Sequence, residues 1–277
     1  MSAARLAAHV GAHRQLGIAS RRHRVPRARW PALIESDYAA RLVSLIDRIR
    51  PVIERALPEM LAGLPRGIRT DVHDSARARR VIERARAEID DAASTHAIEH
   101  LGRDIGARVA TQQRGEFERQ TRAALGVEPV FIDRGLPGTI EAFAHENASL
   151  IQSLQGRTLD EIANIITRAH ASGTRAEAVA DEIAARFGVA GRHARLISRD
   201  QIGKLNSKVA AQRHQELGLT SFEWVSMRDD KVRRSHVLLD RKRFRYDRPP
   251  AEGLPGMPVC CRCVPHPVFD DLLALIP

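Results

Sequence analysis

The sequence predicts a mainly α protein with a small C-terminal α+β module: an N-terminal helical hairpin, a helical array, then two or three short strands. Only 4% of the 277 residues are aromatic, so Ala, Leu, Ile and Val must build most of the core. Apolar residues recur at steps of three and four through most of the chain, which is the spacing of one helix face. After residue 220 the apolar residues alternate instead, which is typical of strands.

Residues 1–30 are predicted to form a basic arm that ends in the stretch "RRHRVPRARW". Such an arm can follow a phosphate backbone or remain a solvated tail. The first 34 residues lack an apolar stretch of the kind that secretory signals contain, so a plain arm is favoured over a targeting segment. The arginines of this arm are Arg21, Arg22, Arg24, Arg27 and Arg29.

Residues 31–112 are predicted to form the helical hairpin. One helix runs from Pro31 to about residue 64 and is kinked or broken at Pro51, because proline lacks the backbone N–H that a helix requires. A second, longer helix runs from residue 72 to about residue 112. The stretch "GVEPVFIDRGLPG" then predicts that residues 113–139 are a linker or a single strand at a domain boundary.

The helical array is predicted over residues 157–218. Two capping boxes, each a Thr followed by a Glu three residues later, start helices at Thr158 and Thr174. Gly173 and Gly188 are expected to end these helices. A longer helix follows and is closed by Gly218.

A mixed module is predicted over residues 220–269. The stretches "SFEWVSM" and "RKRFRYD" alternate as strands do, and "KVRRSHVLLD" between them is compatible with a short helix. The stretch "CCRCVPHPVF" is a third strand. Pro265 and Pro267 predict that this strand lies at a sheet edge, because proline cannot donate to a neighbouring strand.

The charge balance is strongly basic, with a formal net charge of +10 and a pI near 10.6. Such a chain is attracted to DNA, RNA or an acidic protein surface. The alternative is that the net charge and the pI reflect an arginine-rich composition whose side chains form an ordinary solvated face. The arginines of the module that could contact DNA or a partner are Arg228, Arg234, Arg241, Arg243 and Arg245.

All three cysteines lie within "PVCCRC", residues 258–263, and their odd number excludes a simple disulfide framework. Cys263 with either Cys260 or Cys261 could bind zinc together with His236 and His266, and the set His236, Cys261 and Cys263 is the candidate site. Packing of the cysteines as small apolar side chains, with the histidine hydrogen-bonded nearby, is favoured over zinc.

Two catalytic alternatives are weaker. His236 with Asp240 and nearby arginines could activate a water as a nuclease does, and Asp229 and Asp230 could bind magnesium. Cys–His nucleophilic catalysis has candidate residues, but no spacing selects one pair. The cysteine and histidine segments are therefore expected to hold the module together rather than to catalyse a reaction.

The second half of the chain resembles the phage Mu F-type head morphogenesis proteins, also called minor head or portal-associated capsid proteins. The resemblance covers roughly residues 140–269 and includes "ENASLIQSL", "ARLISRDQIGKLNSKVAAQRHQELGL", "FEWVSMRDDKVRRSHVLLDRKRFRYDRPP" and "LPGMPVCCRCVPHPV" in order. Its motif residues are Trp224, Asp230, Val232, Arg233, His236, Leu239, Asp240, Pro255, Gly256, Cys261, Arg262 and Cys263.

Two departures from the family pattern carry structural expectations. The family usually has Gly where this chain has Arg241, which predicts a positive φ there, with the turn rebuilt or the arginine strained. Cys260 replaces a small polar residue. Some similar proteins have cysteines at the positions of Arg233 and His236. This chain has only the histidine at these two positions, which makes zinc less expected. The pattern still predicts that the segment with Arg233 and His236 lies beside the cysteine segment.

The resemblance implies that residues 140–277 form a Mu F-type head morphogenesis domain. It implies a non-enzymatic virion protein inside the capsid near the portal, in the host cytoplasm during assembly, without a cofactor or membrane. The expected partners are the portal protein and packaged double-stranded DNA, with scaffold and major capsid protein as further candidates. The alternatives are a metal-dependent nuclease or toxin-like enzyme carried in the head, and a basic DNA-binding protein.

Overall fold

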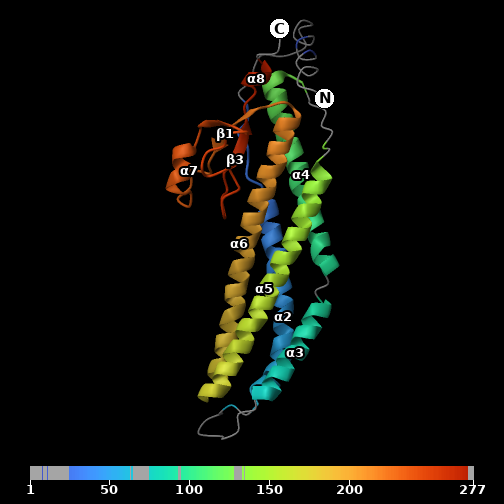
Figure 1. The fold of residues 1–277 in the computed structure, drawn as a ribbon, viewed down its shortest axis with the longest axis vertical. Coiled ribbons are helices and arrows are strands. Elements are labelled where there is room, and N and C mark those ends of the chain that lie inside the picture. The colour runs from blue at the N-terminus through green and yellow to red at the C-terminus, as the bar shows by residue number, and fades with distance from the viewer. Residues whose placement is uncertain are drawn as a thin grey trace. The chain divides into compact units, whose positions relative to one another are not determined.

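The computed structural model describes residues 25–62, 75–92, 95–127 and 135–273, together with residues 8, 11, 64 and 133. Long helices are followed by a small antiparallel sheet, which confirms the predicted fold class (Figure 1). No helix among these residues has both the length and the apolar character needed to cross a membrane. The elements are α2 Ala32–Met60, α3 Ser75–Ala92, α4 Thr95–Leu125, α5 Leu136–Ser172, α6 Ala176–Glu216, β1 Ser221–Val225, α7 Arg234–Leu239, β2 Arg243–Arg245, β3 Val264–Pro267 and α8 Asp270–Leu273.

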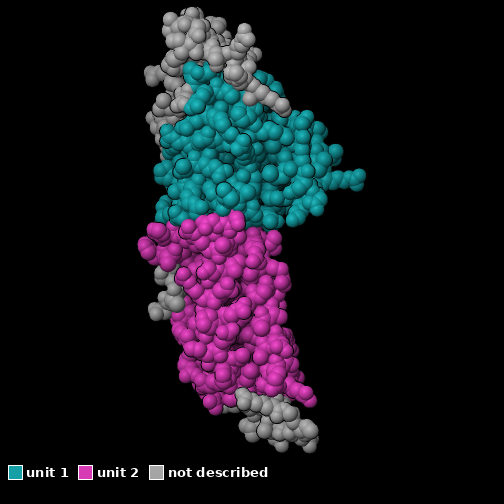
Figure 2. Space-filling view, turned by 180° about the vertical axis from the view of Figure 1, so that it is seen from behind, with its two compact units in different colours: residues 1–35, 103–143, 199–277 teal, residues 36–102, 144–198 magenta. Residues whose placement is uncertain are grey.

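The chain divides into two compact units (Figure 2). Unit 1 contains residues 1–35, 103–143 and 199–277, and unit 2 contains residues 36–102 and 144–198. Both units therefore draw residues from the predicted hairpin and from the predicted C-terminal domain.

Unit 2 is helical, and its core follows the apolar faces expected from the sequence. Helix α2 buries Tyr38, Ile49 and Ile53, and the Tyr38 hydroxyl donates a 2.5 Å hydrogen bond to Asn147 Oδ1 on α5. The predicted break at Pro51 is wrong, because α2 continues through it. Pro51 lies on the exposed side, and the buried residues before and after it hold one continuous helix against the core.

The predicted second helix of the hairpin is instead two helices, α3 and α4, and α4 continues to Leu125. Most of the interval 113–139 is therefore helical rather than a linker. The reason is that Phe117, Thr121 and Ala124 are buried along one face of α4, and this packing outweighs the weak helix propensity of Gly115. The short apolar run proposed as a strand, residues 130–132, lies outside the described residues.

Helices α5 and α6 are longer than the capping patterns predicted. Thr158 lies inside α5, where its hydroxyl donates to the Leu154 carbonyl oxygen at 2.8 Å, so it starts no helix. Gly188 lies inside α6 and does not end it. Gly173 and Gly218 follow the ends of α5 and α6 with φ of 67° and 85°, as expected of residues that close helices.

Unit 1 contains the sheet, which has the order β2-β1-β3 and is antiparallel throughout. Phe222 pairs with Phe244 across β1 and β2, and Trp224 pairs with Pro265 across β1 and β3. Strand β3 is an edge strand, as Pro265 and Pro267 predict. The strands and α7 lie beside α6 (Figure 1).

The last residues of the predicted basic arm pack against other segments of unit 1. The Pro26 carbonyl oxygen accepts a hydrogen bond from Gln120 Nε2 at 3.2 Å, and the Ala28 N–H donates to His266 Nδ1 at 3.3 Å. Trp30 is buried. Residues 25–30 are therefore docked rather than free, and the side chains of Arg27 and Arg29 remain exposed.

Candidate functional site

The helix α7 segment and the cysteine segment lie together, as the family pattern predicts. The Arg233 guanidinium donates a 2.7 Å hydrogen bond to the Val259 carbonyl oxygen. His236, which lies on α7, is buried. The ring of Trp224 meets the His236 ring edge-on, with the ring centroids 5.1 Å apart. The core of this module also contains Phe222, Cys261 and Cys263, with Leu239, Phe244, Tyr246 and Leu254 packed against it.

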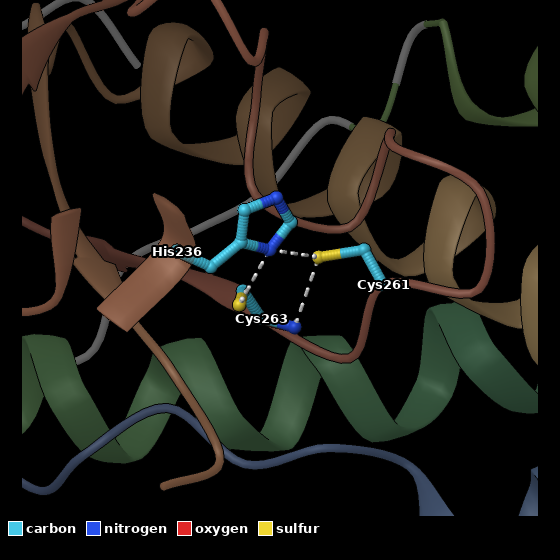
Figure 3. Close-up of side chains that lie close together, drawn as sticks. All are labelled: His236, Cys261 and Cys263. Atoms are coloured by element: carbon cyan, nitrogen blue, oxygen red, sulfur yellow. Dashed lines mark hydrogen bonds between the residues drawn. The ribbon is translucent and has the colours of Figure 1, made fainter. Parts of the chain in front are cut away.

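His236, Cys261 and Cys263 converge in the middle of this core (Figure 3). The Nδ1 atom of His236 lies 3.4 Å from the Cys261 sulfur and 3.6 Å from the Cys263 sulfur. The Cys263 backbone N–H donates to the Cys261 sulfur at 3.4 Å. All three side chains are buried, and their ligand atoms lie within 4.8 Å of one another.

The two thiols do not titrate alike. The hydrogen bond from Cys263 lowers the pKa of Cys261 to about 6, and backbone N–H groups and His236 act in the same direction against the effect of burial. The same thiol pair and burial raise the pKa of Cys263. The arrangement therefore favours a thiolate on Cys261 that accepts a hydrogen bond from the Cys263 thiol.

The second ring nitrogen of His236 faces a carboxylate. Its Nε2 atom is buried and makes no hydrogen bond, although Glu252 Oε2 lies 3.5 Å away. A hydrogen bond from Ser235 and the proximity of His236 lower the pKa of Glu252. Glu252 comes from the irregular loop "RPPAEGLPG", and no sequence pattern indicated a role for Glu252 itself.

Asp240 lies in the turn that follows α7 and binds the turn between β1 and α7. Its carboxylate accepts hydrogen bonds from the Ser226 backbone N–H at 2.8 Å and from the Arg228 guanidinium at 2.8 and 2.7 Å. Arg228 and Arg241 both have positive φ, 56° and 65°. Arg241 thus occupies the glycine-type conformation that the family pattern predicted.

The loop before the cysteines packs closely on α6. The Cys260 N–H donates to Asp200 Oδ1 at 2.9 Å, and Cys260 has a φ of 54°. A Cβ atom on Gly203 would lie 2.8 Å from the Cys261 carbonyl oxygen. Gly256, with a φ of 94°, lies against the same turn of α6. Sequence reasoning missed Asp200 and Gly203, since both fit an ordinary helix.

A pocket of about 170 Å³ opens onto the His–Cys cluster. Its lining includes all three cluster residues and several basic side chains. The basic residues are Arg199, Lys231, Arg233 and Arg262.

Several residues considered as ligands lie elsewhere. His266 Nδ1 accepts from the Ala28 N–H, so His266 is not the fourth ligand considered from the sequence. Cys260 is not in the cluster, which leaves Cys261 and Cys263 as the sulfur pair. Asp229 pairs with Arg262, and Asp230 is exposed in the turn before α7. Among the described residues, the only group of three or more His, Cys, Asp or Glu side chains spaced to hold a metal is His236, Cys261 and Cys263.

The basic candidates fall into three groups. Arg21, Arg22 and Arg24 lie outside the described residues. Arg27, Arg29, Arg234 and Arg241 are exposed. Arg228, Arg243 and Arg245 are also exposed, but they pair with Asp240, Asp270 and Asp247.

Comparison with known proteins supports the resemblance. Residues 160–265 match the family described as Phage Mu protein F like protein. An uncharacterized protein of Haemophilus influenzae is 30% identical over 181 residues, which is 64% of this chain. The chain spans 40% of that relative's length. No solved structure matches the chain. The match over residues 160–265 confirms the resemblance to this phage protein family for that part of the chain.

Proposed function

Because residues 160–265 are a Mu F-like region, we propose that this protein is a minor head protein required for head morphogenesis. It would bind at or near the portal inside the capsid and contact packaged DNA. Its role is structural rather than catalytic. The observation that carries the proposal is the ordered match through α6 and the small module, which includes the packed Trp224, His236, Cys261 and Cys263.

The surface of the small module favours protein docking. Six large apolar side chains are exposed among the described residues, and four of them belong to this module: Met227, Val237, Leu238 and Val259. Leu238 is 67% exposed and Val259 is 64% exposed. The Arg233–Val259 hydrogen bond ties the two segments that carry three of them. Exposed apolar side chains on a module that also exposes basic ones are typical of a protein contact surface.

The net charge of +10 supports an additional contact with packaged DNA. Arg234 and Arg241 on the module and Arg27 and Arg29 on the docked segment are exposed and available for phosphates. This contact would weaken with added salt, whereas the apolar contact with a protein partner would not.

The first experiment is quantitative mass spectrometry of heads purified on gradients from an induced lysate. A few copies per portal ring in both empty and full heads are expected. A protein that stays in the soluble fraction would contradict the proposal, and the free protein would then be assayed for DNA cleavage.

A matched pair of variants locates the docking surface. Leu238→Asp places one negative charge on α7 at a 67% exposed leucine and should remove the protein from heads without changing its melting temperature. Leu33→Asp places the same charge at an 85% exposed leucine outside the module and should leave incorporation unchanged. Equal incorporation of the two variants would contradict docking through α7.

A further inference from the structure

We propose that His236 Nδ1 and the sulfurs of Cys261 and Cys263 bind one divalent cation of the zinc class, with a fourth ligand from the adjoining pocket. The cluster satisfies the donor chemistry of such a site, because zinc is bound in proteins by thiolate sulfur and imidazole nitrogen. All three donors are buried in one module of unit 1 and come from two separate segments of the chain.

The spacing of the donors fits a tetrahedral ion. With Zn–N of about 2.0–2.1 Å and Zn–S of about 2.3 Å, a tetrahedral angle places nitrogen and sulfur about 3.6 Å apart. The His236 Nδ1 atom lies 3.4 Å and 3.6 Å from the two sulfurs. One nitrogen thus faces both sulfurs at the edge length of the coordination tetrahedron (Figure 3).

The other nitrogen of His236 supports the same assignment. A histidine that binds a metal usually donates its remaining N–H to a carboxylate, which fixes the tautomer and the ring orientation. His236 Nε2 is buried without a hydrogen bond, and Glu252 Oε2 stands 3.5 Å from it. With Nδ1 bound to a cation, Nε2 would carry the proton that the Glu252 carboxylate can accept.

The surroundings of the sulfurs are also those of a metal site. The Cys263 N–H points at the Cys261 sulfur, and such a bond stabilises negative charge on the sulfur. Trp224, Leu239 and Leu254 enclose the cluster on its apolar side. The low dielectric there strengthens the attraction between a cation and two thiolates.

The pocket of about 170 Å³ leaves room for the fourth ligand. A divalent ion with two thiolates and a neutral imidazole has no net charge, so the basic side chains that line the pocket favour water or a small anion as the fourth ligand. Binding releases the proton of the Cys263 thiol to solvent, because the ion is held by two thiolates. The bound ion would join α7 to the cysteine segment.

The test uses the purified full-length chain, reduced and stripped of metal. Titration with Zn²⁺ should show one ion per chain and a higher melting temperature. Titration with Co²⁺ should give sulfur-to-cobalt charge-transfer absorption and the visible bands of a tetrahedral ion. Fully reduced thiols that give neither absorption nor a melting shift would overturn the proposal, as would more than one ion per chain.

Variants assign the ligands. Cys261→Ser and Cys263→Ser should each weaken zinc binding strongly and change the charge-transfer band, whereas the neighbouring Cys260→Ser should match the unaltered protein. Glu252→Gln should weaken zinc binding by about 10–100-fold, because it removes the carboxylate beside the histidine. Loss of binding in Cys260→Ser, or unchanged binding in Cys261→Ser, would overturn the assignment. These readouts do not depend on head assembly, so they are independent of the proposed function.

Discussion

Gly256 lies so close to Gly203 that a Cβ atom on Gly256 would stand 2.7 Å from the Gly203 carbonyl oxygen. This contact joins the loop before the cysteines to α6. The atoms that would collide are backbone atoms, which cannot move away as the end of a flexible side chain can. The two glycines therefore decide where the cysteine segment sits on the helix.

The first prediction concerns this contact. Gly203→Ala should destabilise the protein by about 1–3 kcal/mol, because the added methyl group meets the Cys261 carbonyl oxygen at 2.8 Å. Gly191→Ala is the matched control in the same helix, since nothing lies within 4 Å of its Cβ position. The control should be neutral or stabilising by up to about 1 kcal/mol. Urea unfolding measures both, and equal effects would contradict the close approach.

The second prediction concerns Asp240. Burial raises its pKa, but hydrogen bonds from the Ser226 N–H and from Arg228 outweigh burial and lower the pKa below its ordinary value. A lowered pKa in the folded state means that the stabilisation is present above the unfolded pKa, about 3.9, and is lost as pH falls through the folded pKa.

Asp240→Asn should therefore destabilise the protein by about 1–3 kcal/mol at pH 7, because Arg228 and the Ser226 N–H lose a charged acceptor. The difference from the unaltered protein should shrink toward pH 3. Urea unfolding at both pH values measures this. Asp247→Asn is the control and should change stability little, because its pair with Arg245 lies on the surface. A constant difference between pH 7 and pH 3 would argue against the charged hydrogen bonds.

The third prediction concerns Arg241, whose φ of 65° suits glycine. Arg241→Gly should stabilise the protein by up to about 1 kcal/mol, because it relieves the crowding of a Cβ atom in the left-handed region. Lys242→Gly is the control, because Lys242 does not have a positive φ. It should be destabilising, since the glycine only adds backbone freedom to the unfolded chain. Thermal melting of both variants checks the sign, and a destabilised Arg241→Gly would refute the expectation.

The fourth prediction concerns acid. Burial, and then the charges of His266 and Arg213, lower the pKa of His214 to about 3. Burial and then Arg27 lower the pKa of His266 to about 4. Unfolded histidine binds a proton near pH 6.5, so the folded state is favoured fully above that pH and loses stability as pH falls toward these lowered values.

When the pH falls from 7.5 to 5, each of these two histidines should lower the free energy of unfolding by about 2 kcal/mol. His214→Asn should flatten this pH dependence, and replacement of the exposed His145 by Asn should not. Urea midpoints at the two pH values measure the slopes. An unchanged slope in His214→Asn would show that the buried histidine is not the titrating group.

The sequence alone determined the helical class, the order of the elements and the small module at the C-terminus. Local periodicity carries this information, because the residues of one helix face or one strand face lie within a few positions of each other. The edge position of β3 followed from Pro265 and Pro267, and the positive φ at residue 241 followed from the family's glycine. These are local properties of the backbone.

The helix ends were decided by tertiary packing. Pro51, Thr158 and Gly188 are local stop or start signals, yet each lies inside a continuous helix whose apolar face is buried on both sides of it. Burial of a long face contributes more free energy than one unfavourable residue removes. The same balance turned residues 113–125 from a predicted linker into part of α4.

Only the tertiary structure selected the His–Cys cluster and its surroundings. The sequence offered three cysteines and two nearby histidines, and the family pattern pointed to His236, Cys261 and Cys263, but no spacing showed that these three side chains meet. The fold chose Cys261 and Cys263 with His236, because the antiparallel pairing of β1 and β3 and the Gly203–Gly256 contact fix the position of the cysteine segment, which lies just before β3. Glu252 and Asp200 joined the site through contacts between segments distant in sequence, which periodicity within one segment cannot report.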